Sequence, residues 1–295
     1  WRLKKFHIHK KINIIKLNLN SSKEIKKLFN KYGFDEIYNL SSQSSVKRSF
    51  EKPIEAINSA ALVTAKILEE IKKNKKIKFF QASSSEMFGN NGIKVQNENS
   101  AFRPESPYGA SKLLSHNLVR IYRTHHNIHA CCGILFNHDS PFRNDNFILK
   151  KIIKNLIKIK KKKINSFAVG DINIIRDWGF SQDYVHAMWK ILQQKKPDDY
   201  IVATGSSYSL KQIIQKTSDE LGLDAKWIKF QNKESFINKK SKKTLIKINE
   251  KLIRNSENYF SFANPKKIFT KLRWKAKTNL DTLIKIMIKE IAINE

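Results

Sequence analysis

The sequence predicts an α/β protein with a doubly wound parallel sheet and a smaller C-terminal α/β part. Two observations favour this class. Short apolar segments alternate with amphipathic segments through the first half of the chain, which is typical of parallel strands joined by helices. Polar clusters follow three of the expected strands, where open α/β sheets hold their ligands. A chain of 295 residues can bury a large core around such a sheet.

The N-terminal part contains the first expected strand, helix and second strand. Residues 12–19 are apolar enough for a strand. Ser21 is placed to cap a helix that ends near residue 31. The next strand is expected at 36–40, and the polar segment 41–45 that follows it is expected to be a loop.

The other elements follow from the same two periods, with strands where apolar residues are consecutive and helices where they recur every three or four positions. Strands are expected at 77–82 and 130–136, and helices at about 53–73 and 107–126. These elements complete the expected sheet domain.

The second half is less regular. A helix is expected near 147–160, a strand at 200–204 and a closing amphipathic helix at about 280–293. Residues 230–245 form a polar, Lys-rich stretch to which we assign no helix or strand.

The chain is strongly basic, with a net charge of +31 from 57 Lys and Arg against 26 Asp and Glu. Such a charge can neutralise the phosphates of a nucleic acid. However, no zinc-finger spacing, basic region with heptads or aromatic RNA-binding box accompanies it. The Lys excess goes with an excess of Ile and Asn, as a coding bias towards A and T would produce. We therefore expect a solvated, Lys-rich surface and no specific nucleic-acid partner.

Two features bear on the compartment. No apolar run approaches the roughly 18–20 residues of a membrane-spanning helix, so we expect no membrane partner. The two cysteines, Cys131 and Cys132, are adjacent and form no disulfide framework. This usage fits the reducing cytoplasm.

A candidate catalytic group lies around the helix expected at 107–126. Tyr108 and Lys112 are four residues apart, so both side chains lie on one helical face. A cation beside a phenol lowers the phenol pKa, which would make Tyr108 an acid/base and Lys112 its tuner. Ser84 and Glu86 end the preceding strand, where they can face the same crevice. Taken alone, a Tyr–Lys pair at this spacing is also common on solvated helices.

Several strings of residues resemble a known family. They are QASSSEMFG at 81–89, SPYGASK at 106–112, GILFNHDSP at 133–141, RDWG at 176–179 and DYV at 183–185. The first two resemble the extended short-chain dehydrogenases/reductases. Together the strings resemble the GDP-mannose 4,6-dehydratase family, and NHDSP and RDWG separate it from epimerases. The similarity runs from about residue 14 to the end of the chain.

The resemblance implies a Rossmann-like NADP-binding domain at 1–140 and 177–205 and a GDP-sugar-binding domain at 141–176 and 206–295. It implies dehydration of GDP-mannose to GDP-4-keto-6-deoxymannose, with NADP as an internal hydride shuttle. Tyr108 would take the proton of the sugar 4-hydroxyl. Glu86 would remove the C5 proton and help expel the C6 hydroxyl as water. A homo-dimer or homo-tetramer is also implied.

Further site residues are implied by position in the family pattern. The cofactor-binding positions, besides Tyr108 and Lys112, are Asn18, Leu19, Leu40, Ser41, Ser42, Gln43, Ser44, His138 and Arg143. The substrate-binding positions are Ser85, Asn137, Lys151, Arg176, Arg254 and Glu257. Ser84 stands where the family has Thr and keeps the hydroxyl that can bond the sugar O4. No metal site is expected.

The chain departs from the family pattern at several positions near the ligands. Asn18 replaces the Asp that meets the adenine, and Glu55 replaces a cofactor-contacting Tyr. Ser45 replaces a His, and Phe142 and Lys150 each replace an Arg. Together these changes lower the activity expected of the chain.

The largest departure concerns the Gly-rich turn through which backbone N–H groups approach a dinucleotide pyrophosphate. The nine glycines lie at positions 33, 89, 92, 109, 133, 170, 179, 205 and 222, and none forms this fingerprint. With Trp1 as the first residue, this predicts either a fragment or a gene that has lost its cofactor loop. In both cases we expect the chain to bind NADP weakly or not at all.

Other functions remain open from the residues alone. One is a nucleotide-sugar epimerase or reductase of the same superfamily, another is a catalytically inactive fragment, and a third is a nucleic-acid binder. Glu86 close after Ser84 favours dehydration, because epimerisation at C4 needs no carboxylate at C5.

Overall fold

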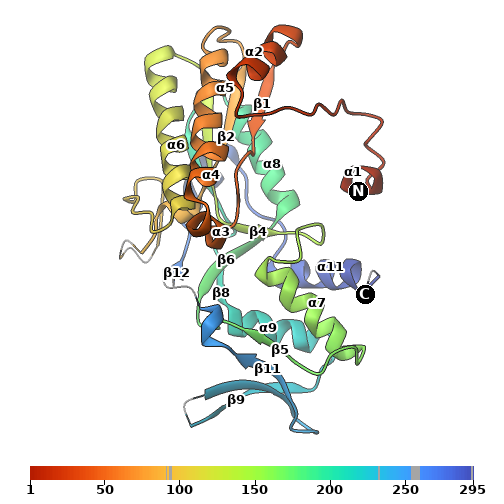
Figure 1. The fold of residues 1–295 in the computed structure, drawn as a ribbon. Coiled ribbons are helices and arrows are strands. Elements are labelled where there is room, and N and C mark those ends of the chain that lie inside the picture. Colours follow the sequence, from red (N-terminus) through yellow and green to blue (C-terminus); the bar gives the residue numbers. More distant parts are fainter. Residues whose placement is uncertain (91, 93–94, 232, 254–259, 294) are drawn as a thin grey trace.

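The computed structural model describes residues 1–295 except 91, 93–94, 232, 254–259 and 294. One end of the molecule is built on a parallel sheet with the strand order β1-β2-β3-β7. Its strands are β1 (Glu36–Asn39), β2 (Lys78–Ser84), β3 (Ala130–Leu135) and β7 (Asp199–Val202). Figure 1 shows α5 (Val63–Ile71) and α6 (Pro107–His126) on one side of the sheet and α8 (Ser181–Leu192) on the other. The predicted doubly wound parallel sheet is confirmed.

Shorter helical elements precede and connect these strands. They are α1 (Arg2–Lys5), α2 (Ser22–Lys31), α3 (Val46–Glu51), α4 (Pro53–Ile57), the π-helical turn η1 (Asn58–Leu62) and the 3-10 turn η2 (Ser85–Met87). The helix expected at 53–73 is therefore interrupted by a change of hydrogen-bond pattern at η1. Helix α3 lies between the loop expected at 41–45 and the helix expected at 53–73, where the sequence predicted no element. It is capped by Ser45, whose hydroxyl accepts the Arg48 N–H at 3.2 Å.

Helix α6 carries the candidate catalytic pair, and its ends follow from the sequence. The Ser106 hydroxyl accepts the backbone N–H of Gly109 at 3.0 Å, which satisfies one of the free donors of the first turn. Pro107 occupies the first helical position, where its missing N–H has no partner to lose. Asn127 ends the helix in the left-handed conformation, with φ of 51°.

Two smaller sheets and three of the described helices make up the other end of the molecule. One sheet contains β4 (Asn137–Asp139), β6 (Ile175–Phe180) and β12 (Phe260–Ser261), with β8 (Ser207–Ser209) antiparallel to β6. The other has the order β5-β11-β10-β9, formed by β5 (Phe167–Val169), β11 (Thr244–Ile248), β10 (Lys233–Asn238) and β9 (Ala225–Phe230). The helices of this end are α7 (Ile148–Lys160), α9 (Leu210–Glu220) and α11 (Leu280–Ala292), with the short turn η3 (Glu250–Leu252). Helix α10 (Lys266–Leu272) instead packs on β7 of the parallel sheet.

The strand expected at 12–19 is wrong. This segment is extended without strand pairing, and Ile14 and Ile15 are 69% and 46% exposed. A strand needs a neighbour for its backbone N–H and C=O groups. In the described part of the chain no strand lies beside this segment, so its apolar sequence alone does not make it a strand.

The polar stretch at 230–245 folds as part of a mixed sheet that the sequence did not predict, in which β10 is antiparallel to both of its neighbours. Strands β9 and β10 pair from Lys233 opposite Phe230 to Asn238 opposite Ala225. A few apolar residues lie among the lysines, and two of them, Phe236 and Ile246, are fully buried in the core of this end. Burial of these side chains selects the strand conformation.

The core is divided between the two ends of the molecule. On β2, the neighbouring residues Phe79 and Phe80 are both fully buried in separate clusters on opposite faces of the parallel sheet. At the other end, one large cluster joins α7, α9 and α11 to the β5-β11-β10-β9 sheet. Within the described ranges, no helix has the length and apolar character needed to cross a membrane.

Candidate active site

The four candidate catalytic residues come together at the carboxyl end of β2. Ser84 is the last residue of this strand, Glu86 lies in η2 directly after it, and Tyr108 and Lys112 lie on successive turns of α6. The start of α6 packs closely on η2. A Cβ on Gly109 would lie only 2.6 Å from the backbone oxygen of Glu86, so the absence of a side chain permits this approach.

Lys112 is buried beneath the site. Its ammonium donates to the backbone oxygen of Ala82 at 2.9 Å and lies 5.8 Å from the centre of the Tyr108 ring. Burial lowers the pKa of Lys112 to about 8 because a charged ammonium is poorly solvated there. Lys112 therefore ties α6 to β2 and can change its charge near neutral pH.

Tyr108 is half-buried, and its environment sets its protonation. Burial raises the pKa of Tyr108; the hydrogen bond with the Ser84 side chain opposes this rise, and the negative charge of Glu86 adds to it. The net direction is opposite to the one expected from the spacing of Tyr108 and Lys112. That expectation was wrong because desolvation of the phenol outweighs the other effects.

Ser84 orders the turn that carries Glu86. Its hydroxyl accepts the backbone N–H of Glu86 at 3.2 Å and so caps η2. Ser85 is buried within the turn, whereas Glu86 is half-buried. The structure thus fixes the backbone of Glu86 and leaves its side chain accessible.

His138 and Arg143 form a second group of candidate cofactor residues beside β4. The His138 Nδ1 lies 2.8 Å from the backbone oxygen of Phe136, so this nitrogen carries the proton and Nε2 is an acceptor. Burial lowers the pKa of His138 to about 4, which keeps the ring neutral. Arg143 donates to the His138 carbonyl and pairs with buried Asp139 at 3.2 Å.

The loop after β1 reaches the same edge of the sheet. Ser41, Ser42 and Gln43 are half-buried there, whereas Leu40 and Ser44 are exposed. The Gln43 backbone N–H donates to the hydroxyl of Ser59 at 3.0 Å, which holds the loop against η1. The five predicted positions therefore lie at one strand end.

Asn18 and Leu19 lie apart from these loops, in the turn that leads into α2. The Asn18 side chain accepts the backbone N–H of Asn20 at 3.0 Å and is exposed, and Leu19 packs on the core under α2. An exposed amide in this turn is accessible to a ligand, but no contact links it to the group around Tyr108.

The described candidate substrate residues other than Ser85 are spread over three elements. Asn137 on β4 is paired with Trp178 of β6, and Arg176 is buried on β6. Lys151 is half-buried on α7. Arg254 and Glu257 lie outside the described residues.

Known proteins similar to this chain agree with the residue pattern. A family model described as GDP-mannose 4,6 dehydratase matches residues 2–287. The chain is 36% identical over 274 residues to the GDP-mannose 4,6 dehydratase of Dictyostelium discoideum, a match that covers 92% of this chain and 77% of that protein. The corresponding Homo sapiens protein is 34% identical over 285 residues, with 96% and 77% covered. This chain belongs to the GDP-mannose 4,6 dehydratase family.

Solved structures confirm the fold of this dehydratase-family chain. RMD from Pseudomonas aeruginosa complexed with NADPH has a TM-score of 0.80 at 18% identity, covering 95% of this chain and 89% of that one. The dTDP-glucose 4,6-dehydratase from Bacillus anthracis in complex with NAD also has a TM-score of 0.80, at 16% identity, covering 99% and 84%. The Rossmann-type arrangement predicted from the sequence is therefore confirmed.

Two residues that support the site of this dehydratase-family chain were missed from the sequence. Tyr184 of α8 is fully buried, and its ring stacks on that of His138 with 4.6 Å between centres. A Cβ at Gly179 would lie 2.2 Å from the Tyr184 ring, so glycine makes room for the stack. Asp177 accepts the backbone N–H groups of Thr204 and Gly205 at 2.9 and 2.7 Å. The RDWG and DYV strings contain three of these residues and were a signal for both contacts.

Proposed function

We propose that this chain dehydrates GDP-mannose to GDP-4-keto-6-deoxymannose, using NADP as an internal hydride shuttle. The observation that carries the proposal is the group of Ser84, Glu86, Tyr108 and Lys112 at the carboxyl end of β2, in a chain of the dehydratase family. Acid/base groups at this edge lie where open α/β sheets bind their ligands.

The residues at this edge fit a nicotinamide cofactor. Neutral His138 offers an acceptor at Nε2, and the loop of Ser41, Ser42 and Gln43 offers hydroxyl and amide groups. NADP bound by these residues would supply the hydride acceptor for the sugar C4 and the hydride donor for C6. These side chains and Lys112 would contact the cofactor.

The proton steps follow from the positions of the side chains. Tyr108, as the phenolate, would take the proton of the 4-hydroxyl as C4 is oxidised, and the Ser84 hydroxyl would bond the same oxygen. The resulting ketone acidifies the C5 proton, which Glu86 removes and passes to the departing C6 hydroxyl, releasing water. Tyr108 returns its proton to C5 as C6 is reduced. The sugar therefore loses one water, and the cofactor is unchanged overall.

We further propose that residues 1–140 and 177–205 hold NADP and that 141–176 and 206–295 hold the GDP-sugar. Arg176 supports the second assignment because a planar guanidinium can bond two diphosphate oxygens at once. Arg176 lies on β6, beside β4, which carries Asn137 and His138. The two ligands would thus meet at neighbouring strands.

A cytoplasmic location is proposed from the cysteines. Cys131 and Cys132 are both free and buried in β3. Burial raises the pKa of both thiols, which makes them poor nucleophiles. Such thiols are suited to a reducing compartment.

The dehydration is tested by mass spectrometry of GDP-mannose incubated with the chain at saturating NADP. We expect a product lighter by one water. We expect Glu86→Gln to prevent the elimination of this water, because an amide cannot accept the C5 proton. Glu70→Gln, on α5 beside Lys73, is a matched control away from this group. An unchanged mass with a changed sugar configuration would indicate an epimerase, and unchanged GDP-mannose would indicate an inactive chain.

We propose that the chain forms a homo-dimer through α4, η1 and α6. Adjacent helices on this face expose large apolar side chains, including Ile54 (67%), Leu62 (44%), Leu114 (47%) and Ile121 (50%). Apolar side chains gathered on neighbouring helices are typical of an association surface. A homo-tetramer would need a second subunit interface in addition to this one.

Sedimentation velocity tests the dimer. Leu114→Glu is expected to convert the dimer to a monomer, because a carboxylate in an apolar interface loses its hydration. Val185→Glu, at a position 59% exposed on α8, is the matched control and should leave the dimer intact. A dimer that survives Leu114→Glu would place the interface elsewhere.

A further inference from the structure

Helix α6 presents a third polar residue to the sheet beyond Tyr108 and Lys112. His116 follows Lys112 by four positions and is only 2% exposed. Its Nδ1 lies 3.0 Å from the hydroxyl of Ser83, the residue directly before Ser84. The three side chains thus lie along one face of α6, which is packed against β2.

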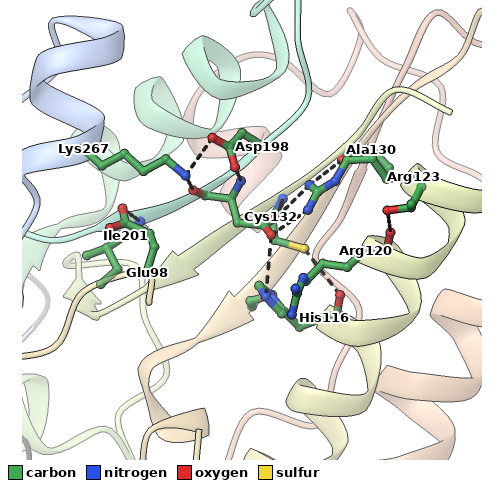
Figure 2. A network of polar contacts seen from close by, with 12 residues as sticks. Glu98, His116, Arg120, Arg123, Ala130, Cys132, Asp198, Ile201 and Lys267 are labelled. Carbon is green, nitrogen blue, oxygen red and sulfur yellow. Dashed lines mark hydrogen bonds and ion pairs between the residues drawn. The ribbon is translucent and has the colours of Figure 1, made fainter. Parts of the chain in front are cut away.

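A buried ion pair holds the other side of the His116 ring. Its Nε2 lies 3.8 Å from a carboxylate oxygen of Asp199. The two terminal guanidinium nitrogens of Arg123 each donate to one oxygen of this carboxylate, at 2.8 and 2.7 Å. The backbone N–H of Cys132 donates to the same carboxylate at 3.1 Å. Figure 2 shows His116 and Arg123 reaching from α6 towards Cys132 on β3. The contacts therefore join α6 to three strands of the sheet.

The ring is neutral, which fixes the roles of its nitrogens. Burial lowers the pKa of His116 to about 4, despite the opposing effect of Asp199. The carboxylate beside Nε2 favours the tautomer with its proton on that nitrogen. Nδ1 is then an acceptor, and the Ser83 hydroxyl donates to it.

We propose that His116 is a positioning residue that sets the place of α6 along β2 and thereby holds Lys112 and Tyr108 in register with Ser84. Lys112 and His116 bond consecutive residues of β2, Ala82 and Ser83, from consecutive turns of the helix. Ser84 follows at once and bonds Tyr108, one turn earlier in α6. A slip of the helix would break all three contacts together. Only the turnover measurement below depends on the dehydratase function proposed above.

The same cluster is poorly suited to hold a metal ion. Ligand atoms of His116, Cys132 and Asp199 lie within 4.8 Å of one another. However, Arg123 already binds both carboxylate oxygens, and its positive charge would repel a cation. The pKa of Cys132 is raised by burial, which disfavours the thiolate that a metal needs. The cluster therefore acts through hydrogen bonds.

The first test measures the position of α6 without turnover. Lys112 is followed by NMR of chain labelled with 13C-lysine, and its signal is assigned with Lys112→Arg. His116→Phe keeps the ring volume but removes the acceptor, and we expect the pKa of Lys112 to rise from about 8 towards its free value of roughly 10.4 as the ammonium becomes hydrated. His116→Asn keeps an acceptor near the Nδ1 position and should hold the pKa near that of the parent chain.

Two further variants guard against misfolding and nonspecific effects. Ser83→Ala removes the same bond from the strand side with little change of volume, so it tests the proposal if His116→Phe does not fold. Thr124→Ala alters an exposed position of α6 and is the matched control. An unmoved Lys112 pKa in folded His116→Phe or in Ser83→Ala would overturn the proposal.

The second test uses turnover of GDP-mannose. A displacement of reacting groups by about 1 Å can cost on the order of 100-fold in rate, so His116→Phe is expected to lower kcat by roughly 10- to 100-fold while KM changes little. His116→Asn should restore most of kcat, which loss of general stability would not explain. Equal changes in KM and kcat would contradict a positioning role. A parent chain without turnover would contradict the dehydratase function and leave the NMR test decisive.

Discussion

Tyr108→Phe is expected to reduce the turnover of GDP-mannose by roughly 10²- to 10⁴-fold, the range that a positioned acid/base contributes. The phenol is the group at the carboxyl edge that can take the 4-hydroxyl proton next to Ser84, and phenylalanine has no oxygen to replace it. The substitution keeps the ring and its packing at the start of α6, so affinity for the sugar nucleotide should change little. Steady-state kinetics by mass spectrometry measure both quantities.

A second tyrosine on the same helix provides the control. Tyr122 bonds Glu69 at the far end of α6, away from the strand ends. Tyr122→Phe removes an equivalent hydroxyl and is expected to leave turnover unchanged. If Tyr108→Phe retained more than about a tenth of the parent activity, a smaller effect than an acid/base gives, Tyr108 would not be the proton acceptor.

The sequence predicted those parts of the fold that are determined by residues close together in the chain. Helix α6 was predicted over its full length from its periodicity, and local residues fix its ends, because Pro107 and the Ser106 cap start it and Asn127 ends it in the left-handed conformation. The strand predicted at 12–19 failed because a strand needs a partner, and partners are a property of the whole fold. Strands β9 and β10 were missed because their lysines are interspersed with the few buried positions that decide the packing.

The site shows the same division between local pattern and tertiary contact. The spacing of Tyr108 and Lys112 correctly placed both side chains on one face of α6. It gave the wrong direction for the Tyr108 pKa, because the ammonium is directed to the oxygen of Ala82 and burial controls the phenol. His116 continues the same spacing by one more turn, so the extended pattern was a visible signal. Its partner Asp199 lies 83 positions along the chain, and only the sheet order brings the two together.

Arg123→Leu is expected to destabilise the fold by about 3 kcal/mol, the lower end of the range for removing one partner of a buried ion pair. Both side chains are largely buried, with 17% of Arg123 and 13% of Asp199 exposed. Burial alone would raise the pKa of Asp199, but the hydrogen bonds and charge of Arg123 are among the effects that outweigh it and lower the pKa. Without Arg123, the carboxylate is left charged and poorly solvated. Urea denaturation at neutral pH measures the loss.

The pH dependence of stability and a double variant distinguish the effect of an unpaired Asp199 carboxylate from the effect of lost packing. In the parent chain, the lowered pKa of Asp199 gives stability that is present above the unfolded value of about 3.9 and is lost as the pH falls through the folded value. In Arg123→Leu, burial is no longer opposed by Arg123 and is expected to raise the pKa of Asp199, so acid protonates Asp199 and relieves the penalty. The difference in stability between the two chains should therefore shrink as the pH is lowered from 7 to about 5.

Asp199→Asn removes the charge but can still accept the Cys132 N–H, and adding Arg123→Leu to it should cost much less than 3 kcal/mol. An equal cost in both backgrounds would mean that the Arg123 side chain stabilises the fold by packing and not by pairing with Asp199.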